Sequence, residues 1–439
     1  MKSKDLSVPA VLLASFLNLL GFTMASPIQP ALGKHFELPL GASFGSLSSA
    51  YPLGMMLGVF LWPTLSDLIG RKIVMAITLA GSGMGLLLQS FGVQRQWTLQ
   101  QFLAARVLTG CFAGNSPISK AYLADRGKGN GTELAKYLAW KDAASTMAFI
   151  VGPVLGGLLY QGGKSVVDNT KSISFVILCS AVASLLASFS IITCVQSQNT
   201  KEAVVSNDTK AAANSTNASV TDSTEKGKES IISCPLGTRL WTGVATVACV
   251  SALYHAADST FFAFFPSLLQ NRLNFDTQGV GLTFTMFAFI SFGMSAFGSA
   301  RFISRFGPVA SCSTGLGVIG TALLALGYAA SHSGIRAVLP LILGAASLYY
   351  VGVPLYGPSV PTMLLQCVPS NKRGVVMGLD GTVNTLARVV SPLAMGEIHR
   401  RFGPGFCFGA AGLFVYAAVI LALIRRWVVL RKDFMKTST

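Results

Sequence analysis

Five charged side chains stand inside stretches of sequence that are otherwise apolar. They are the carboxylates Asp142, Asp258 and Asp380 and the guanidinium groups Arg106 and Arg388. An ionised group is costly in an apolar environment and is usually retained there for a function. Burial favours the neutral form of a carboxylate and a nearby cation favours its charged form, so such a group can take up and release a proton. We therefore expect these residues to bind protons or a charged ligand.

The surroundings of Asp258 suggest a proton site. His255 and Tyr254 precede it by three and four residues, so all three side chains share one face of a helix. A titratable imidazole beside a carboxylate is a plausible proton carrier. The alternative is a solvated residue at the outer mouth, because Asp258 lies about 28 Å from Arg239 along a straight helix.

Asp142 and Asp380 occupy matching positions, each about 10 Å from the cytoplasmic start of its helix by helical rise. We predict that they are paired gate residues. Lys141 could extend back to the membrane interface, which would leave Asp142 facing a cavity. Asn384 and Arg388 follow Asp380 at four-residue steps and extend its polar stripe.

Arg106 lies about 13 Å beyond Trp97 by helical rise, close to the expected centre of a bilayer. Together with Arg388 it gives the deep part of the expected cavity a positive charge. This charge favours an anionic or zwitterionic substrate, or carboxylate partners during a proton cycle. The alternative is a structural arginine that is satisfied by helix-end carbonyls or polar neighbours.

Three tyrosines, Tyr349, Tyr350 and Tyr356, lie among Pro354, Pro358 and Pro361. Prolines free backbone carbonyls and bend a membrane helix. The aromatic rings could stack on a flat ligand, or they could pack against lipid or core.

The composition places these residues in a membrane. The chain has 439 residues, of which 51% are apolar and only 11% are charged. Soluble proteins carry about 25% charged residues, so a soluble domain is excluded. The eight cysteines show no CxxC and no Cys/His metal spacing, and they are expected to pack as small apolar residues. We expect no metal, no cofactor and no nucleic-acid partner, because membrane topology explains the net charge of +16.

A membrane helix needs about 20 mainly apolar residues. On this basis we expect an all-α protein with twelve transmembrane helices, over residues 8–32, 44–66, 73–93, 98–124, 136–160, 172–195, 239–269, 278–300, 308–331, 336–367, 375–398 and 406–425. Lys and Arg are retained on the cytoplasmic side of short loops. Most of the 33 Lys and Arg residues fall on one side if both termini are cytoplasmic, which is the predicted orientation.

Residues 196–238 form a Ser-, Thr-, Asn- and Lys-rich run that is too polar to order itself. We interpret it as a cytoplasmic linker between two six-helix halves, residues 1–195 and 239–425, with a cytoplasmic tail over 426–439. Its acceptor patterns at Asn207, Asn214 and Asn217 should then stay unglycosylated.

The two halves repeat each other. Four pairs of residues in equivalent places are separated by 237 to 239 residues: Gly70 and Gly307, Gly114 and Gly352, Asp142 and Asp380, and Pro153 and Pro392. This indicates a duplicated unit, and transporters commonly place a substrate cavity between two such halves.

The segment PTLSDLIGRK, from Pro63 to Lys72, resembles the signature loop GxLaDRxGRK of the major facilitator superfamily. Pro63 and Leu68 depart from that pattern, whereas four residues match it: Asp67, Gly70, Arg71 and Lys72. An Asp beside a Gly turn and two cations can pair across a cytoplasmic gate. The alternative role for the two cations is to fix topology.

The segment from Arg106 to Gly114 is similar to the family's RxxxGxxG pattern. The motif Gly152-Pro153-Val-Leu-Gly156-Gly157 resembles the GPxxGG motif of drug/proton antiporters, which include the tetracycline exporters. The resemblance covers nearly the whole chain and implies a bendable, closely packed helix that seals the outer side. One departure is Asn18, since that branch often carries an acidic residue in the first span.

The resemblance implies a secondary transporter, with proton-coupled export of a small amphipathic organic compound as the first expectation. The alternatives are a facilitative or uptake carrier for an organic anion, favoured by Asn18, Arg106 and Arg388, and a non-transporting receptor or scaffold. No hydrolase motif or ATP-binding loop is present. We expect a monomer in the plasma membrane or an organellar membrane, with a small molecule and protons as its ligands.

Overall fold

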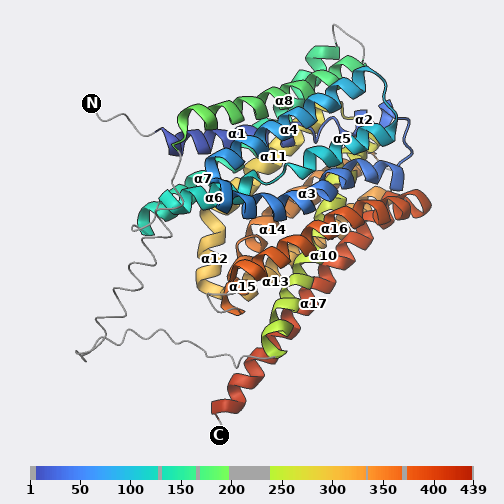
Figure 1. Cartoon of the computed structure of the whole chain (residues 1–439). Helices are drawn as coiled ribbons and strands as arrows, with labels where there is room; N and C mark the ends of the chain where they lie inside the picture. Colours follow the sequence, from blue (N-terminus) through green and yellow to red (C-terminus); the bar gives the residue numbers. More distant parts are fainter. Residues whose placement is uncertain are drawn as a thin grey trace.

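The computed structural model describes residues 6–126, 131–164, 169–196, 238–332, 335–367 and 373–437. Almost all of the predicted linker, with its three acceptor asparagines, lies outside the described residues. In Figure 1 most helices of the first half lie above most of those of the second half, whereas α11 lies among the first-half helices and packs against α7.

The first half contains eight helical segments. They are α1 (Ser7–Met24), α2 (Gln29–His35), α3 (Ala42–Ile69), α4 (Arg71–Gln94), α5 (Leu99–Cys111), α6 (Asn115–Arg126), α7 (Gly131–Lys164) and α8 (Asn169–Cys194). The second half contains α10 (Thr238–Leu273), α11 (Thr277–Met294), the π-helical turn η1 (Ser295–Ser299), α12 (Ala300–Phe306), α13 (Pro308–Ser331), α14 (Ile335–Tyr356), α15 (Ser359–Cys367), α16 (Arg373–Phe402) and α17 (Pro404–Thr437).

Within the described residues, ten helices are long and apolar enough to cross a membrane. They correspond to ten of the twelve predicted spans. The fourth span is instead broken into α5 and α6, and the eleventh, α16, carries Asp380, Asn384 and Arg388 along its length. Both exceptions come from residues that lower the apolar content or interrupt the helix, so length and hydropathy alone undercount the crossings.

The break between α5 and α6 has a local cause. A methyl group at Gly114 would lie 2.5 Å from the Cβ of Trp62, so the chain packs tightly against α3 just before α6 begins. The indole Nε1 of Trp62 donates a hydrogen bond of 2.6 Å to the Cys111 carbonyl oxygen. A carbonyl that the end of α5 leaves without a helical partner is thereby satisfied.

Two equivalent turns support the predicted duplication. Gly70 joins α3 to α4 with φ of 102°, and Gly307 joins α12 to α13 with φ of 81°. Side chains disfavour this backbone region, whereas glycine adopts it readily. The same turn has therefore been kept at the same place in both halves.

The halves contact each other through two matching helix pairs, α7 with α11 and α3 with α16. A methyl group at Gly281 of α11 would lie 2.3 Å from the Pro153 carbonyl oxygen, and one at Gly45 of α3 would lie 2.0 Å from the Pro392 carbonyl oxygen. Glycine is thus required at both crossings for the backbones to approach this closely.

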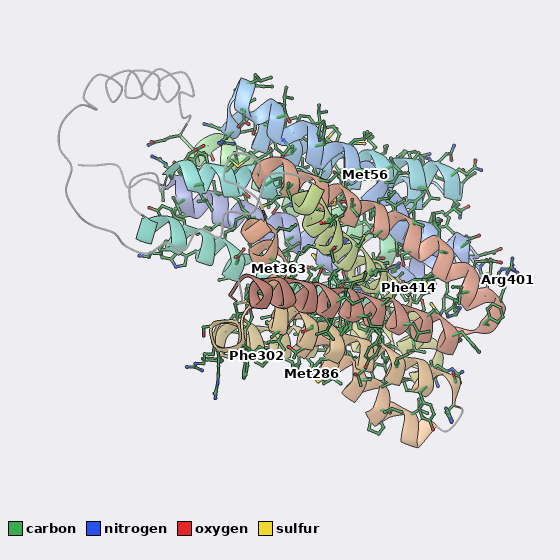
Figure 2. All side chains as sticks on the ribbon, turned by 90° about the horizontal axis from the view of Figure 1, so that it is seen from below. Met56, Met286, Phe302, Met363, Arg401 and Phe414 are labelled. Carbon is green, nitrogen blue, oxygen red and sulfur yellow. The ribbon has the colours of Figure 1, made fainter. Side chains whose placement is uncertain are left out.

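The outside of the bundle is apolar, as lipid contact demands. Phe60 is 78% exposed and Leu413 is 63% exposed. Met286 and Phe414, labelled in Figure 2, are further large apolar side chains that the bundle leaves exposed. The last helix, α17, runs beyond the predicted end of its span at residue 425 and continues to Thr437.

Candidate functional site

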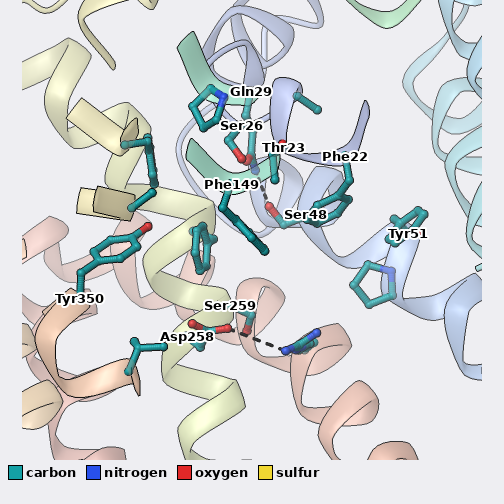
Figure 3. A pocket seen from close by; sticks show the side chains of 18 of the residues that line it. Phe22, Thr23, Ser26, Gln29, Ser48, Tyr51, Phe149, Asp258, Ser259 and Tyr350 are labelled. Carbon is teal, nitrogen blue, oxygen red and sulfur yellow. Dashed lines mark hydrogen bonds and ion pairs between the residues drawn. The ribbon is translucent and has the colours of Figure 1, made fainter. Parts of the chain in front are cut away.

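A cavity of about 450 Å³ lies between the two halves. Its walls come from α1, α2, α3, α5 and α7 on one side and from α10, α11, α14 and α16 on the other. The lining residues that carry a polar side chain are Thr23, Ser26, Gln29, Ser48, Tyr51, Arg106, Thr146, Tyr254, Asp258, Ser259, Ser291, Tyr349, Tyr350 and Arg388. Figure 3 shows Asp258 and Ser259 on one wall, with Tyr51 and Phe22 across the space from Tyr350.

The second half contributes Asp258 as the cavity's carboxylate. Its Oδ1 accepts hydrogen bonds from the hydroxyl of Tyr349 at 2.7 Å and from the hydroxyl of Tyr254 at 3.4 Å. Its Oδ2 lies 4.0 Å from Nη2 of Arg388, and its side chain is only 14% exposed. The alternative placement of Asp258 at a solvated mouth is therefore wrong.

His255 is connected to the carboxylate of Asp258 through Arg388. Nη2 of Arg388 lies 3.0 Å from Nδ1 of His255. Because a guanidinium can only donate hydrogen bonds, Nδ1 must be the acceptor in this contact and therefore carries no proton. The predicted neighbours Asp258 and His255 are thus linked through a shared cation.

Arg106 is the cation of the opposite wall. Its guanidinium carbon lies 5.9 Å from the centroid of the Phe102 ring. Toward the residues that the structure describes, it makes no hydrogen bond and no ion pair. The structural alternative, in which helix-end carbonyls satisfy Arg106, therefore has no support among the described contacts.

Aromatic rings cover much of the remaining wall. Tyr349 stacks on Phe261 at 4.3 Å between centroids, and Tyr350 stacks on Phe287 at 5.3 Å. The third predicted tyrosine, Tyr356, packs against Tyr254 and does not line the cavity. The rings of Tyr349 and Tyr350 are therefore held by neighbours in fixed orientations.

Several cavity residues of α3 and α7 were not predicted from the sequence, although Pro153 of α7 was predicted and lines the cavity. Tyr51 and Ser48 lie on α3, where Ser48 accepts a hydrogen bond from Gln29, and Phe149 lies on α7. Polar residues one turn apart in an apolar helix, such as Ser48 and Tyr51, are the signal that could have indicated this wall.

Asn18 does not line the main cavity. It lines a separate chamber of about 80 Å³ inside the first half, and Arg106 and Tyr51 line both spaces. The structure thus brings Asn18 and Arg106 to one chamber, although 88 positions of sequence separate them.

Asp380 and Asn384 form a pair outside the cavity. Nδ2 of Asn384 donates a hydrogen bond of 2.9 Å to Oδ2 of Asp380. Arg388, the third member of the predicted stripe, turns to Asp258 and His255 instead.

Asp142 is exposed and does not line the cavity. The prediction that Lys141 extends to the membrane interface is wrong. Lys141 is only 3% exposed, and its Nζ donates a hydrogen bond of 3.3 Å to Ser116 Oγ on α6. Residues 141 and 142 point to different sides of α7, and Lys141 lies on the buried side.

The signature loop forms an ionic cluster within the first half. Nη1 of Arg71 lies 3.1 Å from Oδ1 of Asp67, and Nε of Arg71 is paired with Oδ2 of Asp125 on α6. Asp125 was not predicted from the sequence. Lys72 is partly exposed beside this cluster.

The glycine-proline motif packs against two helices at once. A methyl group at Gly152 would lie 1.9 Å from Oγ1 of Thr23, and one at Gly156 would lie 2.3 Å from the Met24 carbonyl oxygen, both on α1. A methyl group at Gly157 would lie 2.9 Å from the Cα of Gln278 at the start of α11. The absence of side chains at these positions allows α1, α7 and α11 to meet.

The contact between the halves is tight at one end only. On α16, a methyl group at Gly396 would lie 2.3 Å from the Gly41 carbonyl oxygen, whereas Gly378 and Gly381 have no atom within 4 Å. On α11, Gly281 is in close contact and Gly293 has no atom within 4 Å. The halves therefore meet at the end that holds Gly41 and separate toward the end that holds the signature loop.

The chain matches the family model described as Major Facilitator Superfamily over residues 11–392 and 247–436. It is 24% identical over 434 residues to mouse major facilitator superfamily domain-containing protein 10, covering 90% of this chain and 88% of that protein. It is 23% identical over 389 residues to the class G tetracycline resistance protein of Vibrio anguillarum, covering 87% and 88%. These matches confirm the resemblance predicted from the motifs.

Solved structures share the fold. The human organic anion transporter MFSD10 (TETRAN) matches with a TM-score of 0.63 and 20% identity, covering 96% of this chain and all of that chain. A D-xylose-proton symporter matches with a TM-score of 0.71 and 15% identity, covering 94% and 96%. The predicted architecture of two six-helix halves is thereby confirmed.

Proposed function

The chain belongs to the major facilitator superfamily, and we propose that it carries a small amphipathic organic anion across the membrane through the cavity between its halves. The observation that supports this substrate class is Arg106, a guanidinium on the cavity wall without a carboxylate partner among the described residues. Buried charges are normally paired, so a charged ligand is the natural partner.

The rest of the wall fits the proposed ligand. A cavity of about 450 Å³ falls in the range of small-molecule sites, roughly 300–1,000 Å³. Arg106 can hold an anionic group through charge-assisted hydrogen bonds. Tyr349 and Tyr350 offer fixed rings on which a flat apolar body can stack. One structural neighbour, human MFSD10, is an organic anion transporter, which agrees with this substrate class.

Asp258 is the proposed proton carrier. It shares the guanidinium of Arg388 with His255, at 4.0 Å and 3.0 Å respectively. Protonation of Asp258 removes the negative charge that occupies Arg388, and Arg388 can then attract a substrate anion. Proton and anion therefore favour each other's binding, and they would move in the same direction.

A second candidate function is proton-coupled export by antiport. It is supported by the glycine-proline motif and by relatives named for tetracycline resistance. Antiport requires that proton and substrate compete, which a neutral or cationic substrate would do by binding to the carboxylate of Asp258. The two candidates thus differ in the charge of the substrate and in the sign of the coupling.

The roles of the remaining predicted residues follow from the same scheme. We propose that the cluster of Asp67, Gly70, Arg71 and Lys72 controls opening at the predicted cytoplasmic end. Gly152, Pro153, Gly156 and Gly157 would seal the opposite end. Asp142 and Asp380 would serve as paired gate residues at the end that holds the signature loop, when the two halves close there. A monomer suffices for this scheme, because one chain supplies both walls of the cavity.

Uptake into proteoliposomes tests the proposed substrate class. The probes are a naphthalene sulfonate, which is a permanent anion, and the uncharged sulfonamide of the same shape. We expect protein-dependent uptake of the sulfonate only. Arg106→Ala should lower this uptake by about 10- to 100-fold, because a hydrogen bond to a charged group contributes about 1.5–3 kcal/mol.

Arg95→Ala is the matched control, since Arg95 is an exposed arginine outside the cavity that lies over the Phe91 ring. It should leave uptake near the wild-type rate. Equal uptake of the sulfonate and the sulfonamide, or unchanged uptake by Arg106→Ala, would contradict the proposal. Protein-dependent transport of a cationic dye alone would favour the antiport candidate.

A further inference from the structure

A small polar chamber adjoins the main cavity inside the first half. It has a volume of about 80 Å³ and lies between α1, α4, α5 and α8. Asn18, Gln89 and Ser184 contribute polar side chains to its wall. Arg106 lines this chamber and the main cavity, so its guanidinium stands where the two spaces adjoin.

Four of the polar side chains that line the chamber, those of Ser82, Gln89, Thr109 and Ser180, make hydrogen bonds within the protein. Nε2 of Gln89 donates to Oγ1 of Thr109 at 2.6 Å, and Oγ of Ser180 donates to the Val176 carbonyl oxygen at 3.0 Å.

Four polar side chains of the chamber differ from these, and two of them are the hydroxyls of Tyr51 and Ser184, which make no hydrogen bond to a described residue. Neither the carboxamide of Asn18 nor the guanidinium of Arg106 makes a hydrogen bond or ion pair to a described residue. Their donor groups therefore remain available to a ligand.

The chamber has positive charge without a protein counter-charge. Among the described residues that line it, none is an aspartate or a glutamate. An unpaired cation away from water is costly, and a negative charge beside it lowers that cost. Asn18 cannot provide the charge, but its amide can donate two hydrogen bonds to an anion.

We propose that this chamber is a subsite for a small monovalent anion, held between Arg106 and Asn18 and occupied by chloride when no substrate is present. The proposal adds to the transport function above, because the anionic group of a substrate would use the same guanidinium from the side of the main cavity. A chloride ion and the substrate's anionic group would then compete for Arg106.

The size of the chamber fits this occupant. A water molecule takes about 30 Å³ in the liquid, so about 80 Å³ accepts one small ion with very few waters and excludes an aromatic body. The aromatic part of a substrate must remain in the main cavity, where Tyr349 and Tyr350 lie.

Thermal unfolding of the purified full-length chain tests the subsite without any organic ligand. The melting temperature is measured in chloride and in gluconate at equal ionic strength. A ligand that binds only the folded state stabilises it by RT ln(1 + L/Kd), where L is the ligand concentration, so the stabilisation grows with the logarithm of that concentration. We expect chloride at about thirty times its dissociation constant to raise the melting temperature of the wild-type protein by about 2 °C.

Two substitutions at Asn18 remove the site by different means. Asn18→Asp gives Arg106 a carboxylate, and Asn18→Leu removes the amide donors and fills the chamber. Both variants should lose the chloride response while remaining monodisperse on gel filtration. Ser291→Asp is the matched control, since it adds a carboxylate to the main cavity but not to the chamber, and it should keep the response.

Competition provides the second measurement. Chloride at nine times its own dissociation constant should raise the dissociation constant of the naphthalene sulfonate about tenfold in the wild-type protein. Equal melting temperatures in chloride and gluconate would overturn the proposal and leave the chamber to water. A wild-type chloride response in both Asn18 variants would also overturn it, because the ion would then bind elsewhere. Since the unfolding assay contains no amphipathic organic anion, its outcome is independent of whether the protein transports one.

Discussion

Arg388 determines how the charged residues of the cavity influence one another. Its guanidinium lies between Asp258 and His255, which are three residues apart on α10. The sequence predicted that Asp258 and His255 share a helix face and that Arg388 lies deep in the bundle. It could not predict their contact, because that contact depends on how α16 packs against α10.

Asp258→Asn tests the proton role of this carboxylate. The amide has the same shape and no charge, so Arg388 should be permanently available to an anion. We expect uptake of the naphthalene sulfonate to persist and to lose its dependence on an imposed proton gradient. The measurement is sulfonate uptake into proteoliposomes at several external pH values.

Glu397→Gln serves as the control for this variant. Glu397 pairs with Arg400 and Arg401 near the end of α16, outside the cavity. Its substitution should leave the pH dependence of uptake as in the wild-type protein. A proton-dependent rate that survives in Asp258→Asn would show that another group carries the proton.

At the scale of helices, the proline-glycine crossings explain why the halves can separate at one end. Gly396 contacts Gly41 between α16 and α3, whereas Gly378 on the same helix has no atom within 4 Å. Periodicity and spacing predicted the duplicated Pro153 and Pro392. They carry no information on which helix of the other half each proline meets, because that is a property of the tertiary packing.

Gly396→Val should disfavour the conformation described here. Its side chain would enter the Gly41 backbone and force α16 away from α3 at the closed end. The reporter is Ser291→Cys on the cavity wall, in a parent chain without other cysteines. When Gly396→Val is added to this parent chain, we expect the cysteine to react at least fivefold faster with an impermeant maleimide added from the closed side. Gly378→Val on the same helix should leave this reactivity near the level of the parent chain. Equal reactivity of both glycine variants would contradict the assignment of the closed end.

Gly307→Ala should destabilise the protein through its backbone conformation. With φ of 81° between α12 and α13, an alanine would be strained by about 1–3 kcal/mol. Gly317→Ala is a matched control inside α13, where a methyl group has no atom within 4 Å. It should be neutral or stabilising, by up to about 1 kcal/mol, because alanine favours a helix. Thermal unfolding in detergent compares the two, and a Gly307→Ala variant as stable as Gly317→Ala would contradict the strain.

At the scale of the whole molecule, composition and hydropathy predicted the fold better than the site. The twelve crossings were predicted because each needs only enough apolar residues to cross the bilayer. The structure explains why two crossings fail the test of length and hydropathy. The fourth is broken into α5 and α6, and the eleventh, α16, carries a stripe of charged and polar residues.

The candidate site was predicted only in part, because its residues come from nine helices. Arg106, Asp258 and Arg388 were found since a charge in an apolar stretch is conspicuous. Tyr51 and Phe149 were missed since a tyrosine or phenylalanine is ordinary in a membrane helix. The prediction for Lys141 was wrong because its polar partner, Ser116, lies on a neighbouring helix. The sequence of one helix does not show which residues of another helix it contacts.

The sign of proton coupling tests the central claim most directly, because protonation of Asp258 is proposed to free Arg388 for the substrate anion that Arg106 also attracts. The measurement is uptake of the naphthalene sulfonate into proteoliposomes under an imposed pH gradient, with the membrane potential clamped to zero. The account predicts that an acidic exterior accelerates uptake and drives the sulfonate above its external concentration, and that Arg106→Ala abolishes this. Accumulation driven instead by an acidic interior would contradict the account, since proton and substrate would then be exchanged.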